Sequence, residues 1–386
     1  MPTPSELDSI SLDQLRASGS VKWTAFPDAI GAFVAEMDFG TAPAVTRALH
    51  DVVDRGLLGY LPGPAIGEMQ RAYAGFAKRR YGWSVEPEHV RPVPDVLAAF
   101  EAVVRHLTPD GSPVILPTPA YMPFGPLLRD LGGPVLPVPL VQDEGGRSTH
   151  DLDALDAAFA TGARLLVLVN PHNPTGRVFE RAELAAVSAV VERHGGRVFA
   201  DEIHAPLVYA GREHVPYASV SAATAAHTVT ATSASKAWNV PGLKAAQLVL
   251  SDDATAEEWR RVGTWTEHLT STVGVVANTA AYDDGEDWLT DVLAYLDGNR
   301  RLAADLLAEH LPEVGFVPPE GTYLAWLDLR AYGLEDPAGW LRRRAGVALT
   351  NGTDCGTAGA GFVRLTLATP RPILRTLIGR LATALT

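Results

Sequence analysis

Short apolar runs rich in branched residues alternate with helix-like stretches from about residue 45 onward. Pro, Gly or Asp bounds these runs, which is typical of buried strands in a parallel sheet. The predicted strands are residues 113–116, 165–169, 197–200, 228–231 and 246–250. Residues 96–107 and 181–194 have apolar positions at helical spacing and are predicted helices. The alternation of the two element types predicts an α/β fold with a mainly parallel sheet.

The pattern changes after about residue 285, where a second lobe begins. A long helix is predicted through residues 291–310, and residues 321–328 and 361–367 alternate as half-buried strands do. Residues 1–44 have weak periodicity and are expected to lie over this lobe. We therefore predict two domains: a large one over residues 45–285, with helices on both faces of its sheet, and a smaller α+β domain from residues 1–44 and 286–386.

Composition narrows the possible functions. The 386 residues are 47% hydrophobic and 20% charged, and the length suits two domains or one domain with a lobe. The formal net charge of −13 argues against nucleic acid or an anionic membrane as a partner. The N-terminal residues lack a basic segment followed by an apolar one, so a cytoplasmic protein is expected. Cys355 is the only cysteine and the 11 histidines are scattered, so neither a disulfide within the chain nor a metal site is expected.

Polar and aromatic residues directly follow four of the predicted strands. These segments are residues 117–121, 170–173, 201–204 and 232–236. Ligands of open parallel sheets bind outside the carboxyl ends of the strands, where segments far apart in the sequence meet. We therefore expect all four segments to form one site.

Lys236 lies in the last of these segments, in the run TATSASKAWNVPGLK that starts at Thr230. A lysine amine becomes a nucleophile toward an aldehyde when burial or neighbouring positive charge lowers its pKa. The hydroxyls of Ser233 and Ser235 and the ammonium of Lys244 are groups that can hold an attached phosphate. Taken alone, the run fits a Schiff-base lysine and a surface lysine on a polar loop equally well.

Three further residues at strand ends have both a structural and a chemical interpretation. Asp201 could cap the following helix, or pair with a protonated ring nitrogen and keep a heterocycle cationic. Asn173 lies in a turn-like segment, yet its amide could donate to a phenolate oxygen. Tyr121 could pack in a proline-rich loop or stack on a cofactor ring.

These residues, in this order, resemble the pattern of fold-type I pyridoxal phosphate (PLP) enzymes of the class I/II aminotransferase superfamily. The resemblance covers nearly the whole chain, and the interval of 35 residues between Asp201 and Lys236 suits the family. The residues that carry it are Tyr121, Asn173, Asp201, His204, Ser233, Lys236, Lys244 and Arg364. It implies the fold-type I PLP-dependent transferase fold, with the large and small domains predicted above.

Within the superfamily the chain is most similar to the MalY/PatB group of C-S β-lyases, which are cystathionine or cysteine-S-conjugate β-lyases. The similar segments are residues 34–39, 59–60, 201–204, 235–244 and 362–365. His204 is the most specific feature, because general aminotransferases usually have tyrosine at this position. The chain departs from the group at Glu36, where aspartate is usual, and at Cys355, where an aromatic residue is common. Both departures bear on the identity of the substrate.

The resemblance implies a role for each matching residue around a bound PLP molecule. Lys236 would carry the cofactor as a Schiff base, Asp201 would pair with its pyridine nitrogen, and Tyr121 would stack on its ring as part of the catalytic set. Asn173 and His204 would contact its phenolic oxygen. Its phosphate would be held by Ser233, Lys244, the backbone N–H groups of Val96 and Leu97, and Tyr60 of a second subunit.

The resemblance also implies how a substrate is bound. Arg364 lies on the more polar face of the strand at residues 361–367, where its guanidinium would clamp the carboxylate of an amino acid substrate. Asn173 and Tyr121 would lie beside the same substrate. A site completed by a second subunit implies a homodimer.

Two reactions remain open, because both use the same catalytic residues. In each, Lys236 removes the α-proton of an amino acid, and the ring held by Asp201 spreads the charge. Loss of a sulfur group from the β-carbon gives a thiol, pyruvate and ammonia, whereas return of the proton and release of a keto acid is aminotransferase chemistry. The subgroup resemblance favours a lyase acting on L-cystathionine or related cysteine S-conjugates. A regulatory protein on the same fold is a weaker alternative, because Lys236, Asp201 and Arg364 are intact.

Overall fold

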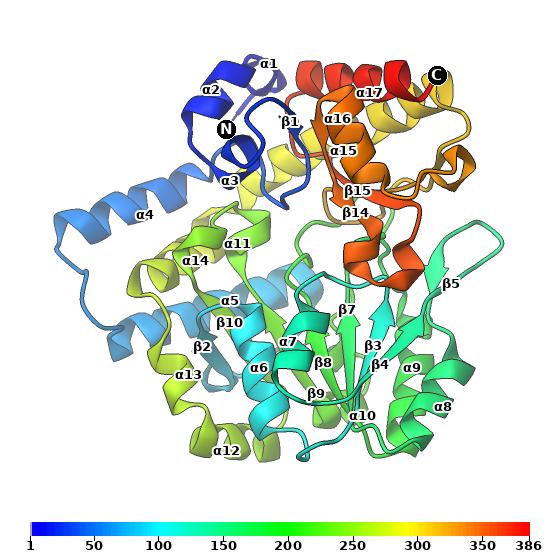
Figure 1. Ribbon diagram of the computed structural model, residues 1–386. Helices are drawn as coiled ribbons and strands as arrows, with labels where there is room; N and C mark the ends of the chain where they lie inside the picture. The colour runs from blue at the N-terminus through cyan, green and yellow to red at the C-terminus, as the bar shows by residue number, and fades with distance from the viewer. Residues whose placement is uncertain (1) are drawn as a thin grey trace.

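A seven-stranded sheet forms the centre of the computed structural model, which describes residues 2–386 (Figure 1). In spatial order its strands are β2 (Val90–Val93), β10 (Ala246–Leu250), β9 (Thr228–Thr232), β8 (Arg197–Asp201), β7 (Leu165–Val169), β3 (Val114–Thr118) and β4 (Val135–Pro139). Strand β10 runs opposite to the other six strands of this sheet. The prediction of an α/β fold with a mainly parallel sheet is confirmed.

The central strand β7 shows that helices bury both faces of this sheet. All five of its residues are apolar and buried. Its odd-numbered residues pack in a core with α6 (Val96–His106) and α12 (Asp253–Val262). Its even-numbered residues pack in another core with α8 (Leu152–Ala160) and α9 (Arg181–Arg193). Because successive side chains of a strand point to opposite faces, an uninterrupted apolar run requires helices on both sides.

The C-terminal part of the chain forms a second, antiparallel sheet, in the upper half of Figure 1. Its strands in order are β11 (Gly315–Phe316), β12 (Leu324–Asp328), β15 (Phe362–Thr366) and β14 (Thr350–Asn351). Helices α15 (Glu286–His310), α16 (Pro337–Ala345) and α17 (Arg371–Leu385) share a separate core with it. The N-terminal segment joins this core, because β1 (Ile30–Gly31) pairs with β13 (Val347–Ala348). The domain division at residues 44 and 285 stays a proposal.

Further helices connect or cover these two sheets. They are α1 (Pro4–Asp8), α2 (Leu12–Ala17), α3 (Val21–Thr24), α4 (Pro43–Asp54), α5 (Gly63–Tyr81), α7 (Phe124–Asp130), α10 (Ala222–His227), α11 (Ala234–Ala237), α13 (Thr264–His268) and α14 (Thr272–Asp284). A short hairpin consists of β5 (Val141–Gln142) and β6 (Ser148–Thr149). Among residues 2–386, none of the helices combines the length and the apolar character needed to cross a membrane.

The apolar pattern did not predict the strands β2 and β4. Both are edge strands of the large sheet, and both contain proline: Pro92 in β2, and Pro137 and Pro139 in β4. Proline cannot donate to a ladder of backbone hydrogen bonds, so it is tolerated at an edge and weakens the strand signal. In these two strands of the large sheet, the residue preference argues against a strand that the position at the edge permits.

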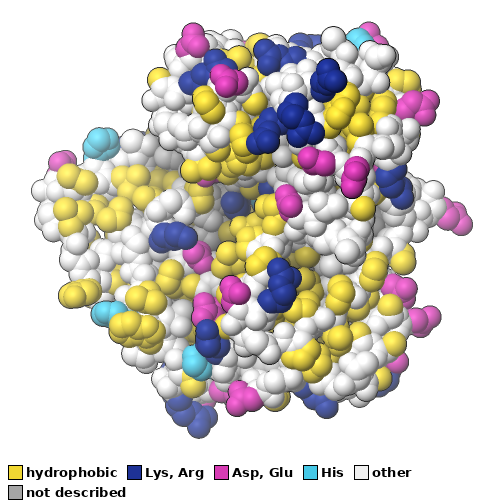
Figure 2. All heavy atoms as spheres, in the orientation of Figure 1, with side chains coloured by type: hydrophobic (Ala, Val, Ile, Leu, Met, Phe, Trp, Pro, Cys, Tyr) yellow, Lys and Arg dark blue, Asp and Glu magenta, His cyan; other side chains and the backbone are white. Residues whose placement is uncertain are grey.

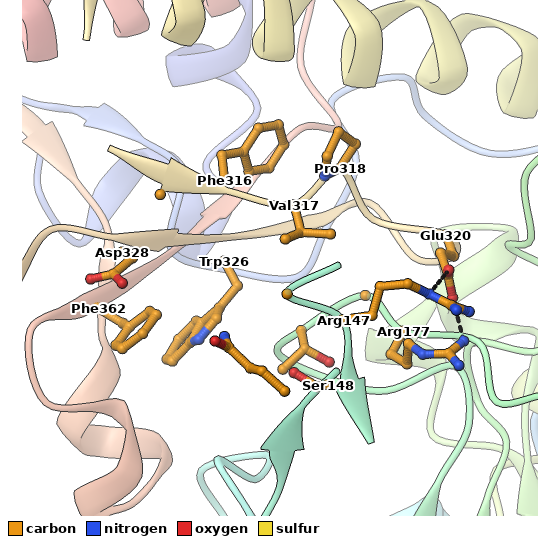
Figure 3. A pocket seen from close by; sticks show the side chains of 15 residues that line it. Arg147, Ser148, Arg177, Phe316, Val317, Pro318, Glu320, Trp326, Asp328 and Phe362 are labelled. Carbon is orange, nitrogen blue, oxygen red and sulfur yellow. Dashed lines mark hydrogen bonds and ion pairs between the residues drawn. The ribbon is translucent and has the colours of Figure 1, made fainter. Parts of the chain in front are cut away.

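A group of charged residues beside a cavity of about 190 Å³ connects the C-terminal part of the chain to the large sheet (Figure 3). Glu320, in the loop before β12, accepts hydrogen bonds from Arg147 Nε at 2.9 Å and from an Arg177 guanidinium nitrogen at 2.6 Å. It also accepts one from the Val178 backbone N–H at 3.0 Å and pairs with Arg212 at 2.9 Å. The Arg177 side chain is only 4% exposed. Glu320 shares these arginines with Glu180 and Glu183, and it ties the loop to the large sheet.

We expect Glu320→Ala to lower the free energy of unfolding by about 2 kcal/mol, because the buried Arg177 guanidinium then keeps only Glu183 as an anionic partner and the Val178 N–H loses its acceptor. Urea unfolding of the purified protein measures this change. Glu335→Ala, at an exposed position, is the matched control and is expected to change stability little. Equal unfolding midpoints for the two variants would contradict the prediction.

Candidate active site

A cavity of about 520 Å³ lies at the carboxyl ends of the central parallel strands, next to the second sheet. In Figure 2 the molecule is hollowed between the upper and lower parts of the view, with hydrophobic side chains around the hollow. The predicted site residues on the cavity wall are Lys236, Asp201, Asn173, His204, Tyr121, Lys244, Val96, Leu97 and Arg364. The structure therefore brings the four strand-end segments together at one site.

The position of Lys236 is fixed by the short helix α11, which begins two residues after β9 ends. Ser233 caps this helix, and its hydroxyl accepts a hydrogen bond from the Ser235 N–H at 3.0 Å. Asn278 Oδ1 accepts another from the Ala234 N–H at 3.0 Å. With two of its first backbone donors held, the helix presents Lys236 to the cavity in a fixed direction.

The Lys236 ammonium is half-buried in the cavity wall and has few partners. It donates to the Ala35 carbonyl oxygen at 3.0 Å, which also accepts from the Tyr323 hydroxyl at 2.9 Å. Burial, together with the charge of Arg364, lowers the pKa of Lys236 from 10.5 to about 8. A larger share of this amine is therefore neutral near pH 7 to 8 than for an exposed lysine.

Asp201 is the last residue of β8 and is buried in the same wall. It accepts a hydrogen bond from the Ile203 N–H at 3.1 Å. Burial raises its pKa from 3.8 to about 7, against the opposing effects of that hydrogen bond and of Lys236. A carboxyl group with a raised pKa lacks compensating positive charge, so a cation in the cavity would be strongly favoured as its partner.

His204 contributes a neutral ring to the site. Burial, followed by the charges of Lys236 and Arg364, holds its pKa well below the ordinary value. Its Nδ1 is buried and makes no hydrogen bond within residues 2–386. Since an unsatisfied buried nitrogen costs stability, this atom is suited to bond with a ligand in the cavity.

Arg364 is buried in the middle of β15, and three segments hold its guanidinium. One terminal nitrogen donates to Asn173 Oδ1 at 3.0 Å, and the other donates to the Phe33 carbonyl oxygen at 2.8 Å. Thr350 Oγ1 accepts at 3.2 Å. Within the described chain Nε has no partner. A fixed guanidinium with donor capacity left over is suited to bind a carboxylate.

The structure does not place two predicted residues on the cavity wall. The Ser233 hydroxyl is buried and donates to the Ala245 carbonyl oxygen at 2.7 Å, while Ser235 lines the cavity. Tyr60 is 86% exposed and stacks on His268, with ring centroids 5.5 Å apart. The Ser233 hydroxyl is therefore already used within its own chain, and Tyr60 is free to reach another molecule.

Sequence reasoning missed several residues of the wall. Asp95 caps α6 through the Ala98 N–H at 2.8 Å and pairs with Lys244 Nζ at 2.8 Å. Phe26 and Phe33 come from the N-terminal segment and meet edge to face, with centroids 5.2 Å apart. An aspartate directly before the helix predicted at residues 96–107 is an N-cap signal that could have identified Asp95. No sequence signal identifies the two phenylalanines.

Comparisons with known proteins agree with this geometry. The chain matches the family described as aminotransferase class I and II over residues 30–381. It is 36% identical to the cystathionine β-lyase of Corynebacterium glutamicum, over 97% of this chain and 99% of that protein. It is 33% identical to the cystathionine β-lyase PatB of Bacillus subtilis, over 90% and 91%. The crystal structure of the PLP-bound C-S lyase from Staphylococcus hominis aligns with a TM-score of 0.90 and 29% identity, over 98% of both chains. The chain therefore belongs to the class I and II aminotransferase family.

Proposed function

We propose that this protein is a PLP-dependent C-S β-lyase that cleaves L-cystathionine or related cysteine S-conjugates to a thiol, pyruvate and ammonia. The observation that carries the proposal is one cavity that combines a half-buried amine of lowered pKa, a buried carboxyl and a fixed arginine. Full-length similarity to proteins named cystathionine β-lyase supports the same reaction.

The residues of the cavity fit PLP on their own chemistry. A protonated pyridine nitrogen is the cation that the buried Asp201 carboxyl lacks, and a phenolic oxygen is a partner for His204 Nδ1 and the Asn173 amide. Tyr121 offers a flat ring at the wall. Phosphate would be held by Lys244, Ser235 and the first N–H groups of α6, at Val96 and Leu97. When bound, PLP supplies an electron sink for charge that develops on the substrate.

The protein's own residues would bind the substrate and move its proton. Arg364 binds the α-carboxylate, and Asn173 keeps the guanidinium in place through their hydrogen bond. The neutral Lys236 amine then takes the proton from Cα, for which a pKa of about 8 is well matched to neutral pH. The proton held on Lys236 is available to the departing sulfur. Water taken up by the remaining three-carbon unit gives pyruvate and ammonia.

The low pKa of Lys236 predicts when cofactor-free protein reacts with PLP. Only the neutral amine attacks an aldehyde, so we expect the rate of covalent attachment to rise as the pH increases through about 8 and to level off above it. The growth of long-wavelength absorbance after mixing measures this rate. A midpoint near the ordinary lysine pKa of about 10 would contradict the prediction.

An aminotransferase is the second candidate, because the family model that matches the chain is named for that activity. The two functions differ in what happens without a keto acid acceptor. We expect the purified, PLP-loaded protein to release pyruvate from L-cystathionine over many turnovers with no acceptor present. Turnover that starts only when 2-oxoglutarate or pyruvate is added would identify the aminotransferase instead.

We also propose that two copies of the chain assemble and complete each other's phosphate site. Leu58, Tyr60, Trp265 and Leu269 are each more than half exposed, and His268 stacks between Tyr60 and Trp265. Such a surface is costly in water and is suited to an interface. A second copy of the chain bound at this surface would place the Tyr60 side chain beside Lys244 in the partner's cavity.

The cytoplasmic location expected from the sequence stays a prediction.

Sedimentation equilibrium is expected to give twice the 41.1 kDa mass of the chain. Tyr60→Phe removes only the hydroxyl, so it should leave this mass unchanged and weaken PLP binding about tenfold, because a hydrogen bond to a charged group is lost. A monomer in solution, or PLP affinity unchanged in Tyr60→Phe, would contradict the shared site.

A further inference from the structure

A second cavity, of about 500 Å³, adjoins the catalytic one. Its wall comes from β3, β4, the segment at residues 120–122, helix α7 and the loop at residues 353–357. Tyr121, Met122 and Asp354 line both cavities. Within the second cavity, the Ala120 N–H donates to the Cys355 carbonyl oxygen at 2.7 Å and so holds the loop at residues 353–357 against the end of β3. A substrate side chain that extends beyond the catalytic cavity past Tyr121 would therefore enter this second space.

Two residues of opposite charge line the second cavity, Arg129 on α7 and Asp354 on the opposing loop. Neither makes a hydrogen bond or an ion pair through its side chain within residues 2–386. The Arg129 guanidinium lies over Gly125, which also lines the cavity. Both charges are solvated, so a ligand that binds them does not have to displace an internal partner first.

The rest of this wall is uncharged. Its other side chains are apolar or neutral polar, among them those of Tyr121, Met122 and Cys355. Burial raises the pKa of the Cys355 thiol to about 11, and burial also raises that of the Tyr121 phenol, so both stay neutral at physiological pH. The cavity thus offers one cation and one anion with an uncharged surface between them.

We propose that the second cavity binds the far end of the substrate and selects S-conjugates with a second α-amino acid group beyond the sulfur. Arg129 takes the distal carboxylate and Asp354 takes the distal ammonium. This proposal rests on the proposed lyase function. A zwitterionic end group needs one partner of each sign, which an S-alkyl group does not. L-Cystathionine has such an end group, so the cavity favours it over simple S-alkyl cysteines.

The test compares three substrates on the PLP-loaded enzyme by pyruvate release. L-Cystathionine has both distal charges, S-(2-carboxyethyl)-L-cysteine has the carboxylate alone, and S-propyl-L-cysteine has neither. In both Arg129→Gln and Asp354→Asn, we expect the kcat/KM for cystathionine relative to that for the propyl compound to fall about tenfold. Each variant loses one charge-assisted hydrogen bond to the distal group. Arg129→Gln should also lower the kcat/KM for the carboxyethyl compound relative to that for the propyl compound. Asp354→Asn should leave this second ratio unchanged, because the carboxyethyl compound has no distal ammonium.

Matched controls change the same residue types at exposed positions on other elements, with Arg375→Gln on α17 and Asp305→Asn on α15. We expect both ratios to keep their wild-type values in these controls. Arg129→Lys keeps the charge and should restore part of the lost ratio. Urea unfolding of every variant checks that the fold is intact.

Two outcomes would overturn the distal site while leaving the lyase function in place. If the kcat/KM ratios of Arg129→Gln and Asp354→Asn stay at their wild-type values, the cavity does not bind the distal charges of the substrate. An equal loss on all three substrates would show a general role for the two residues. If the wild-type enzyme releases pyruvate from none of the three, the lyase function itself fails, and the distal site fails with it.

Discussion

Lys236→Ala is expected to lower turnover of L-cystathionine by about 10⁴-fold, because it removes the group that takes the α-proton. The same change should abolish the long-wavelength absorbance of a covalently attached cofactor. Pyruvate release and an absorbance spectrum of the same sample measure the two effects. Both effects depend on the one Lys236 amine, whose pKa is lowered to about 8 in the cavity.

The control for this experiment is Lys78→Ala, at an exposed position on α5. It should keep both the absorbance and the activity. Borohydride should fix the chromophore to the wild-type protein and to Lys78→Ala, but not to Lys236→Ala. If Lys236→Ala retains a covalent chromophore, another lysine carries the cofactor and our assignment of the catalytic amine is wrong.

Arg364→Gln is expected to lower kcat/KM about 10²-fold, with most of the change in KM, because the α-carboxylate loses its charged donor. Arg364→Lys should rescue little of this loss. The guanidinium is held at once by Asn173, Phe33 and Thr350, and a lysine ammonium cannot reproduce those directions together with a carboxylate contact. Initial rates over a range of L-cystathionine concentrations separate KM from kcat.

Arg364 is buried, so its replacement can also loosen the fold, and this must be distinguished from lost substrate binding. Arg375→Gln on the surface of α17 is the control for a lost guanidinium. A structural defect would lower the unfolding midpoint and reduce the amount of active enzyme, which lowers kcat. An unchanged KM in a folded Arg364→Gln protein would contradict the carboxylate role.

The central fold could be predicted because its strands are buried on both faces. The run at residues 165–169 is wholly apolar and forms β7 with the predicted bounds. The strand at 246–250 also has the predicted bounds, whereas those at 197–200 and 228–231 are each one residue longer in the structure. The added residues, Asp201 and Thr232, are polar, which is why the apolar pattern ended before them.

The site was predictable as far as its residues follow those strands or carry family motifs. Asp201 and Lys236 lie after predicted strands, and the motif order identified Arg364. Contacts across the molecule were not predictable in this way. The Ala35 carbonyl that accepts from Lys236 lies 201 positions away in the sequence, and the pairing of Asp95 with Lys244 spans 149.

Some features depend on side-chain direction, which sequence spacing does not determine. Ser233 and Ser235 are both near Lys236, but the cap of α11 uses the Ser233 hydroxyl and leaves Ser235 on the cavity wall. Likewise, Arg129 and Asp354 are unremarkable in sequence. They line one cavity only because α7 and the loop before β15 border the same space.

Product analysis with L-cystathionine as the only substrate tests the account most directly. Purified, PLP-loaded enzyme is incubated without any keto acid, and pyruvate, ammonia and homocysteine are measured against the number of active sites. The account predicts equal amounts of all three products, far above one per site, and none from Lys236→Ala. No homocysteine, with the keto acid of cystathionine formed in at most one equivalent per site until another keto acid is added as acceptor, would contradict the lyase and identify an aminotransferase.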